Sequence, residues 1–271
     1  MYDEKETMLA LELKGQAGFA VSFVSGERLI IKVGKIEMPV EEWFSEYPPS
    51  VLFVEGSELD GNLLIEPKNR EERNFPLSNI ETWKWDQVNI TKESQWKEKL
   101  LRKDSIQFKV IQEFIKRGFE VVIDDDDSGE AADVICISDK KDHIQVILLH
   151  CKYSGGVEPG QRVKDIMEVC GQASRSVKWS WKFVDLCKHI SNRELPKYLR
   201  GRASRFMKGN LNDIQHYAKL SRFKPVKFDV YVVQPGLSKR DMTEEQINVL
   251  SASYGYILDI TGVDLKVICS E

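Results

Sequence analysis

Apolar and polar positions along the chain follow two different patterns, and the change falls near residue 100. Residues 8–66 contain short runs rich in β-branched and aromatic side chains and bounded by glycines, such as GFAVSFVSG and RLIIKVG. Runs of this kind are typical of β-strands. Residues 1–100 are therefore predicted to form a β-rich N-terminal module, with IETWKWDQVNI as a further candidate strand whose tryptophans pack into a core.

From Asp104 or Ser105 onwards, helical and strand patterns alternate. An amphipathic helix that ends near Gly118 precedes one strand, and AADVICIS and IQVILLHC follow as two apolar strands around a charged turn. Residues 161–190 are predicted to be helical, with a basic helical stretch continuing to about residue 223, and KFDVYVVQPG and DLKVIC are predicted to be late strands around one more helix. Residues 101–271 are therefore predicted to form an α/β (α+β) domain, a mixed sheet flanked by helices.

Charge is distributed unevenly, although the net charge of the 271 residues is only −4. Residues 1–100 carry 12 Lys and Arg against 19 Asp and Glu, whereas residues 178–227 carry 13 against 3. The basic block, which begins with Lys178, Trp179 and Trp181, indicates a surface for a polyanion such as DNA. A solvated helical face is the alternative.

Cysteine usage and hydropathy narrow the class of protein. Five scattered cysteines without a CxxC pair favour reduced thiols over a disulfide framework or a structural zinc site. No signal peptide is visible, no apolar run approaches the roughly 20 residues needed to cross a bilayer, and the GxxxxGK[ST] motif of a P-loop is absent. We therefore expect a cytoplasmic protein with no membrane partner.

Residues with chemical potential gather where two predicted strands end. Side chains alternate along IQVILLHCK, so His150 and Lys152 share a face while Cys151 points to the other. If the preceding strand pairs with this one as a hairpin, Asp133 lies near both, with Glu130 just before it. A carboxylate, an imidazole and an ammonium group together can hold a divalent cation and orient a water molecule. The alternative is a histidine at the edge of the core beside a snorkelling lysine.

Asp133, followed after the hairpin by His150-Cys151-Lys152, resembles the motif of the PD-(D/E)xK nuclease superfamily, which includes restriction endonucleases. The longer pattern GEAADV…HCKYS…VCGQASRSVKW is similar to the C-terminal region of bacterial phage-defence helicase-nuclease proteins, as are YPPSVLFVEGSELDGNLL and VVQPGLSK. The resemblance implies a restriction-endonuclease-like fold and a metal-dependent DNA nuclease in anti-phage defence. It also implies a helicase, on the same parent chain or as a partner.

The resemblance assigns a role to each matched residue. Asp133 and His150 would bind Mg²⁺ or Mn²⁺, the backbone carbonyl of Cys151 would add an oxygen ligand, and Lys152 would orient the attacking water. The superfamily usually has Glu or Asp at the position of His150, and imidazole suits transition metals better than magnesium. Three interpretations are possible: an active nuclease with a modified metal site, a nuclease that prefers another metal, and an inactive domain that binds DNA or docks a partner. A thiol enzyme using Cys151 with His150 would need a distorted strand.

Further candidates flank this motif. The superfamily's first helix often supplies an acid, for which Glu113 and Gln107 are the candidates here, and Glu130 is a third possible catalytic residue. The quartet Asp124–Asp127 is predicted to be a solvated acidic turn, although one member could bind a second metal. The helix after the site and the basic block supply the candidate contacts to nucleic acid: Arg162, Gln172, Arg175, Lys178, Arg200, Arg202 and Arg205. For Arg162 and Gln172, the alternative is a polar flank packed on a loop.

Overall fold

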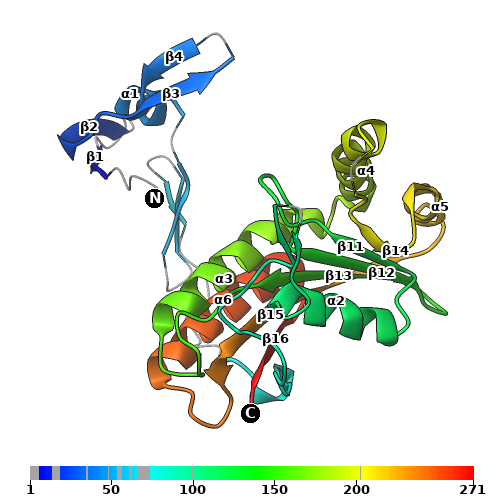
Figure 1. Ribbon diagram of the computed structural model, residues 1–271. Helices are drawn as coiled ribbons and strands as arrows, with labels where there is room; N and C mark the ends of the chain where they lie inside the picture. Colours follow the sequence, from blue (N-terminus) through cyan, green and yellow to red (C-terminus); the bar gives the residue numbers. More distant parts are fainter. Residues whose placement is uncertain are drawn as a thin grey trace. The chain divides into compact units, whose positions relative to one another are not determined.

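The computed structural model describes residues 6–13, 19–34, 36–47, 49–53, 57–60, 63–65, 74–98, 100–201 and 203–271. The chain divides into two compact units, residues 1–71 and residues 72–271, and each is described by itself (Figure 1).

Short antiparallel strands make up most of the described part of the first unit, as the glycine-bounded apolar runs predict. Two of its sheets are pairs and one has three strands. The pairs are β1 (Thr7–Leu13) with β2 (Phe19–Gly26) and β3 (Ile30–Val33) with β4 (Ile36–Pro39). Helix α1 (Val40–Glu46) follows, and the third sheet contains β5 (Val51–Leu52), β6 (Glu58–Asp60) and β7 (Leu63–Ile65).

The boundary between the units lies nearer the N-terminus than the pattern change at residue 100 indicates. After η2 (Leu77–Asn79), strand β8 (Ile80–Thr82) pairs in parallel with the C-terminal strand β16 (Leu265–Ser270) and so belongs to the second unit. Trp83 and Trp85 follow this strand rather than continuing it, and both pack against the core, as predicted for their side chains. A small hairpin of β9 (Trp96–Lys97) and β10 (Leu100–Leu101) completes this segment.

A seven-stranded mixed sheet with the order β14-β11-β12-β13-β15-β16-β8 forms the centre of the second unit. Strands β11 (Val121–Asp124), β12 (Val134–Asp139) and β13 (Ile144–Cys151) form an antiparallel meander, and β15 (Val226–Ser238) runs parallel to β13. Strand β14 (Phe206–Lys208) borders β11. The prediction of an α/β fold with a mixed sheet is confirmed.

Helices pack on both faces of this sheet (Figure 1). On one face lies α2 (Ile106–Lys116), whose start is capped by the Ser105 hydroxyl, which accepts a hydrogen bond from the Phe108 amide over 3.2 Å. On the other lie α3 (Val163–Ser176), α4 (Phe183–Leu199), α5 (Leu211–Leu220) and α6 (Glu244–Thr261). The helix predicted over residues 161–190 is interrupted, because η3 (Val177–Trp179) turns the chain between α3 and α4.

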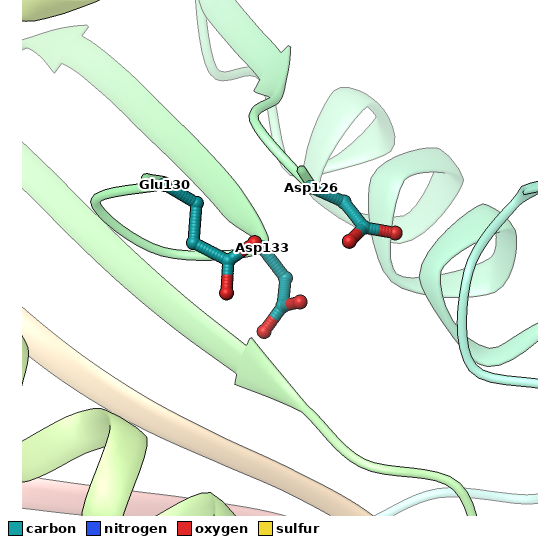
Figure 2. Close-up of side chains that lie close together, drawn as sticks. All are labelled: Asp126, Glu130 and Asp133. Atoms are coloured by element: carbon teal, nitrogen blue, oxygen red, sulfur yellow. The ribbon is translucent and has the colours of Figure 1, made fainter. Parts of the chain in front are cut away.

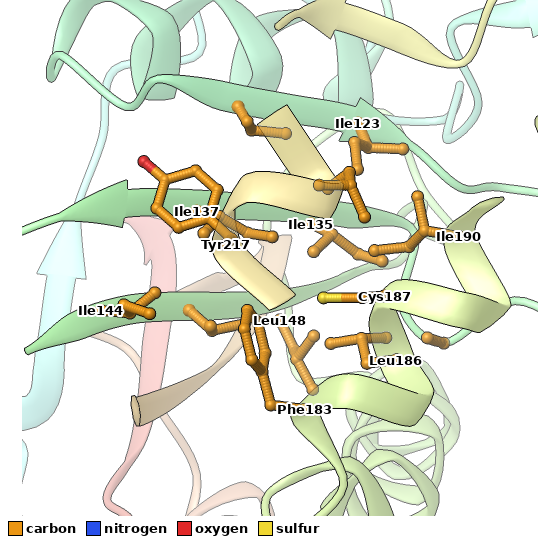
Figure 3. Close-up of a cluster of buried hydrophobic side chains, with 14 of the residues drawn as sticks. Ile123, Ile135, Ile137, Ile144, Leu148, Phe183, Leu186, Cys187, Ile190 and Tyr217 are labelled. Atoms are coloured by element: carbon orange, nitrogen blue, oxygen red, sulfur yellow. The ribbon is translucent and has the colours of Figure 1, made fainter. Parts of the chain in front are cut away.

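The basic block also contributes to the core. Phe183, Leu186 and Ile190 of α4 and Tyr217 of α5 pack with Leu148 and its neighbours on the sheet (Figure 3). Its strand β14 extends the sheet. The predicted surface for a polyanion therefore covers only the outer side of these elements, whose inner side closes one face of the domain.

Candidate metal site

Strands β12 and β13 bring Asp133 and His150 to the same end of the sheet. Val134, the first residue of β12, pairs with Leu149 of β13, so Asp133 and His150 are the next residues beyond that pair. The two side chains are almost fully buried, and Nδ1 of His150 lies 3.9 Å from Oδ2 of Asp133.

Two hydrogen bonds fix the carboxylate of Asp133. The Cys151 amide donates to Oδ2 over 2.9 Å, and the side-chain amide of Gln107 donates to Oδ1 over 3.2 Å. Gln107 in turn accepts a hydrogen bond from the Gln95 amide over 3.0 Å, which fixes its orientation. Of the two candidates on α2, Gln107 therefore reaches the site. Glu113 does not, because it pairs with Lys116 at the outer edge of the helix.

Two more acids converge on Asp133. Asp126 and Glu130, from the loop between β11 and β12, each place a carboxylate oxygen so that the three ligand atoms lie within 4.8 Å of one another (Figure 2). Burial, followed by the charge of Glu130, raises the pKa of Asp133 well above its ordinary value, and burial also raises the pKa of Glu130. Crowded carboxylates with raised pKa values favour a bound proton or a bound cation. The oxygen ligands match those preferred by Mg²⁺ or Mn²⁺.

His150 contributes a buried imidazole with unused bonding capacity. Within the described residues, neither of its ring nitrogens has a hydrogen-bond partner. Burial and then the positive charge of Arg175 lower its pKa to about 3, so the ring is neutral at pH 7. A neutral imidazole can offer a lone pair to a metal or exchange hydrogen bonds with a ligand.

Lys152 immediately follows β13 and has carboxylate partners of its own. Its Nζ atom is 3.0 Å from Glu168 of α3 and 3.5 Å from Glu93, which also accepts a hydrogen bond from the Tyr153 amide. Burial lowers the pKa of Lys152, but the hydrogen bond to Glu168 and the two negative charges outweigh this and raise it. The lysine is therefore charged at neutral pH. Both glutamates were missed in the sequence, where nothing in the spacing links them to Lys152.

The prediction that Asp124–Asp127 form a solvated acidic turn is wrong for Asp124 and Asp125, because both residues are buried. The Nε atom of Arg193 donates to Asp125 over 2.6 Å, and the same guanidinium donates to the carbonyls of Asp125 and Ser128 over 2.8 and 2.7 Å. Arg193, on α4, thus fastens the loop that carries Asp126 and Glu130.

Several predicted contacts to nucleic acid have other roles in the structure. Arg205 is buried and pairs with Asp127 over 3.0 Å, so it does not present a free guanidinium. Arg162 binds Ser154 and the Glu158 carbonyl, each over 2.7 Å, and holds the loop after β13. Arg200 is exposed, and Arg202 lies outside the described residues.

Cys151 joins the site through its main chain. Its thiol points to the opposite face, where it packs with the α2 core, and burial raises its pKa well above the ordinary value. The hypothesis of a thiol enzyme that uses Cys151 with His150 is therefore wrong, because the thiol points to the opposite face and its raised pKa keeps it protonated. The contact between Cys151 and Asp133 runs through the amide, so a ligand role for the Cys151 carbonyl stays a prediction.

A pocket of about 230 Å³ opens beside the acids. His150 and Glu130 line one side of it, and Gln172, Arg175 and Lys178 line the other. These three residues project from the end of α3 and from η3. The pocket thus joins three of the predicted nucleic-acid contacts to two of the predicted catalytic residues.

Comparisons with known proteins give no relative. No protein-family model matches the chain, and neither a curated protein nor a solved structure does. None of the helices in the described part of the chain has the length and apolar character needed to cross a membrane. Any functional assignment therefore rests on the residues of the site.

Proposed function

We propose that this protein is a metal-dependent nuclease that hydrolyses DNA phosphodiester bonds. The observation that carries the proposal is the convergence of Asp126, Glu130 and Asp133 at the end of the β12–β13 hairpin where the charged Lys152 follows β13. Three carboxylates this close together, with Asp133 buried and Asp126 and Glu130 half-buried, repel one another unless a proton or a cation is bound. A cluster of this kind suits a divalent metal that binds phosphate oxygens.

Each residue has a defined part in the proposed reaction. Asp126, Glu130 and Asp133 would hold Mg²⁺ or Mn²⁺, which when bound lowers the pKa of a coordinated water and neutralises phosphate charge. Gln107 and the Cys151 amide fix the carboxylate of Asp133 before any ligand arrives. Lys152, held by Glu93 and Glu168, supplies a positive charge that orients water and stabilises the charge developing on the phosphate.

The proposal extends to the finer fold and the cellular role. Helix α2, the β11–β13 meander, α3 and the parallel strand β15 follow in the order expected of a restriction-endonuclease-like core, with Asp126 and Glu130 in the loop between β11 and β12 and Asp133 immediately before β12. We therefore include that fold in the proposal. The sequence resemblance supports a helicase partner and a role in anti-phage defence.

A second candidate is a non-catalytic domain of the same fold that binds DNA or docks a partner. His150 favours this alternative, because a neutral imidazole stands where the superfamily usually has a carboxylate. Asp126 and Glu130 weigh against it, because together with Asp133 they supply three acidic ligands without any contribution from position 150.

Cleavage assays separate the two functions. Plasmid DNA and a labelled single strand are incubated with the protein in Mg²⁺, in Mn²⁺ and in EDTA. We expect cleavage with either metal and none in EDTA. Asp133→Asn should abolish it, whereas Asp142→Asn, which changes an exposed aspartate in the turn between β12 and β13, should cut like the wild type. DNA binding without cleavage in any metal, with or without the helicase, would establish the second function.

A further inference from the structure

We infer that the pocket beside the acidic cluster binds one nucleotide unit, and that the substrate is consequently a single strand or a strand end rather than the interior of a duplex. The inference deepens the proposed nuclease function and rests on it for the substrate class. The pocket itself can be tested without catalysis.

Unpartnered polar atoms concentrate around this pocket. Both ring nitrogens of His150, Oε1 of Gln172 and Nε1 of Trp179 are buried and lack a hydrogen-bond partner in the described residues, and all three residues line the pocket. Buried polar groups are nearly always hydrogen-bonded. The orphaned set includes a donor, an acceptor and a neutral imidazole that can be either. Inorganic phosphate, which offers mainly acceptors, would not satisfy the Gln172 oxygen, whereas a nucleotide offers both kinds of group.

The cations at the mouth of the pocket can bind phosphate, although Lys178 also lies over the ring of Trp179. Arg175 and Lys178 are exposed, and within the described residues neither forms an ion pair. Arg175 is close enough to lower the pKa of His150 by its charge. Elsewhere in the basic block, Arg193 and Arg205 are used by buried aspartates. Arg175 and Lys178 are therefore the guanidinium and ammonium groups available to a phosphate next to the acids.

The size of the pocket limits what can enter it. Its volume, about 230 Å³, is below the roughly 300–1,000 Å³ of pockets for drug-sized ligands, so the base of one nucleotide can enter while its phosphate stays at the mouth with Arg175 and Lys178. A base pair cannot fit, and a base within a duplex must leave its stack before it can enter such a pocket. Because Glu130 lines the pocket and belongs to the acidic cluster, a nucleotide held here is adjacent to the phosphate that would be cut.

Binding of 2′-deoxyadenosine 5′-monophosphate by the full chain in EDTA tests the pocket separately from the nuclease activity. Calorimetry should show saturable binding that is tighter than that of inorganic phosphate. Arg175→Gln/Lys178→Gln should weaken it at least about tenfold, since hydrogen bonds to charged groups contribute more to binding than neutral ones. The matched control is Lys182→Gln/Lys188→Gln, which removes two exposed charges from the same basic block outside the pocket. It should change affinity less than about twofold, as distant exposed charges are screened.

The outcomes distinguish this inference from the proposed function. No saturable binding, equal affinity for phosphate and nucleotide, or equal loss in both double variants would overturn the nucleotide pocket. Nucleotide binding by a chain that never cuts DNA would support the pocket and overturn the nuclease. If the protein cuts, a labelled single strand should be cleaved at least about tenfold faster than a closed duplex of the same sequence. Equal rates would overturn the substrate class and leave the nuclease intact.

Discussion

Nδ1 of His150 lies 3.9 Å from Oδ2 of Asp133, and no hydrogen bond joins the two buried groups. One octahedral cation with ligand distances of about 2.1 Å can span two ligand atoms up to about 4.2 Å apart. The spacing therefore suits shared binding of a cation or of a water attached to it. Burial and the charge of Arg175 lower the pKa of His150 to about 3, whereas burial and the charge of Glu130 raise the pKa of Asp133. The first predictions below follow from that contrast.

Buried His150 should make the metal-free protein less stable in acid. Its pKa is about 3 in the folded state against an ordinary value of 6.5, so the unfolded chain binds the extra proton as the pH falls through 6.5. That proton favours unfolding, and the loss continues until the pH reaches the folded pKa. Relative to His150→Gln, the wild type should lose about 2 kcal/mol of unfolding free energy between pH 7 and pH 5. Urea unfolding in EDTA measures it, and parallel pH profiles for the two proteins would show that the ring is not buried.

A carboxylate introduced at position 150 should make the stability of the protein depend on the metal. His150→Glu adds an acid beside Asp133, whose pKa is already raised by burial and then by the charge of Glu130. In EDTA at pH 7 the variant should be less stable than His150→Gln by about 3 kcal/mol, the cost of an uncompensated buried charge. Mg²⁺ should restore the loss and support cleavage at least equal to that of the wild type, with less preference for Mn²⁺. If the stability of His150→Glu did not depend on Mg²⁺, position 150 would lie outside the metal site.

Lys152→Met should reduce the cleavage rate by about 10²–10³ while leaving DNA binding nearly unchanged, because in the proposed reaction the lysine stabilises charge that develops at the phosphate. Lys164→Met is a matched control. Lys164 also contacts Glu168, at 3.9 Å against 3.0 Å for Lys152, but it is 85% exposed. Single-turnover cleavage by both variants separates the effect of losing a lysine at position 152 from the effect of losing one positive charge near Glu168. Wild-type rates for Lys152→Met would falsify the assigned role.

Strand periodicity was enough to expect Asp133 and His150 at one end of a hairpin, because side-chain alternation and pairing are local properties of two adjacent strands. The role of Asp126 could not be read in the same way. It belongs to an acidic run, and only the buried ion pairs of Asp125 show that the run turns inward. Charge density likewise cannot separate Arg193 and Arg205, which compensate buried aspartates, from Arg175, which is free. The position of β8 depends on pairing with the distant β16, so the apolar pattern misplaced the boundary between the units.

Arg193→Gln should weaken metal binding although Arg193 lies outside the acidic cluster. Its guanidinium holds the carbonyls of the loop that carries Asp126 and Glu130, so its loss should leave those acids less well positioned. We expect an affinity for Mn²⁺ about tenfold lower, within the 10–100-fold cost typical of lost supporting contacts around a metal site. Lys188→Gln, an exposed substitution on the same helix, is the control. Equal affinities in the two variants, measured where both are folded, would show that the loop keeps its shape without the arginine.

Titration of the full chain with Mn²⁺, followed by electron paramagnetic resonance of the free ion, measures the occupancy of the acidic cluster most directly. We expect saturable binding at pH 7 that weakens at pH 5, because the raised pKa values of Asp133 and Glu130 let protons compete with the metal. Glu130→Gln should weaken binding at least about tenfold, as loss of a charged ligand commonly does, and Asp142→Asn should not change it. Absence of saturable binding, or equal binding by the wild type and Glu130→Gln, would contradict a metal site at Asp126, Glu130 and Asp133.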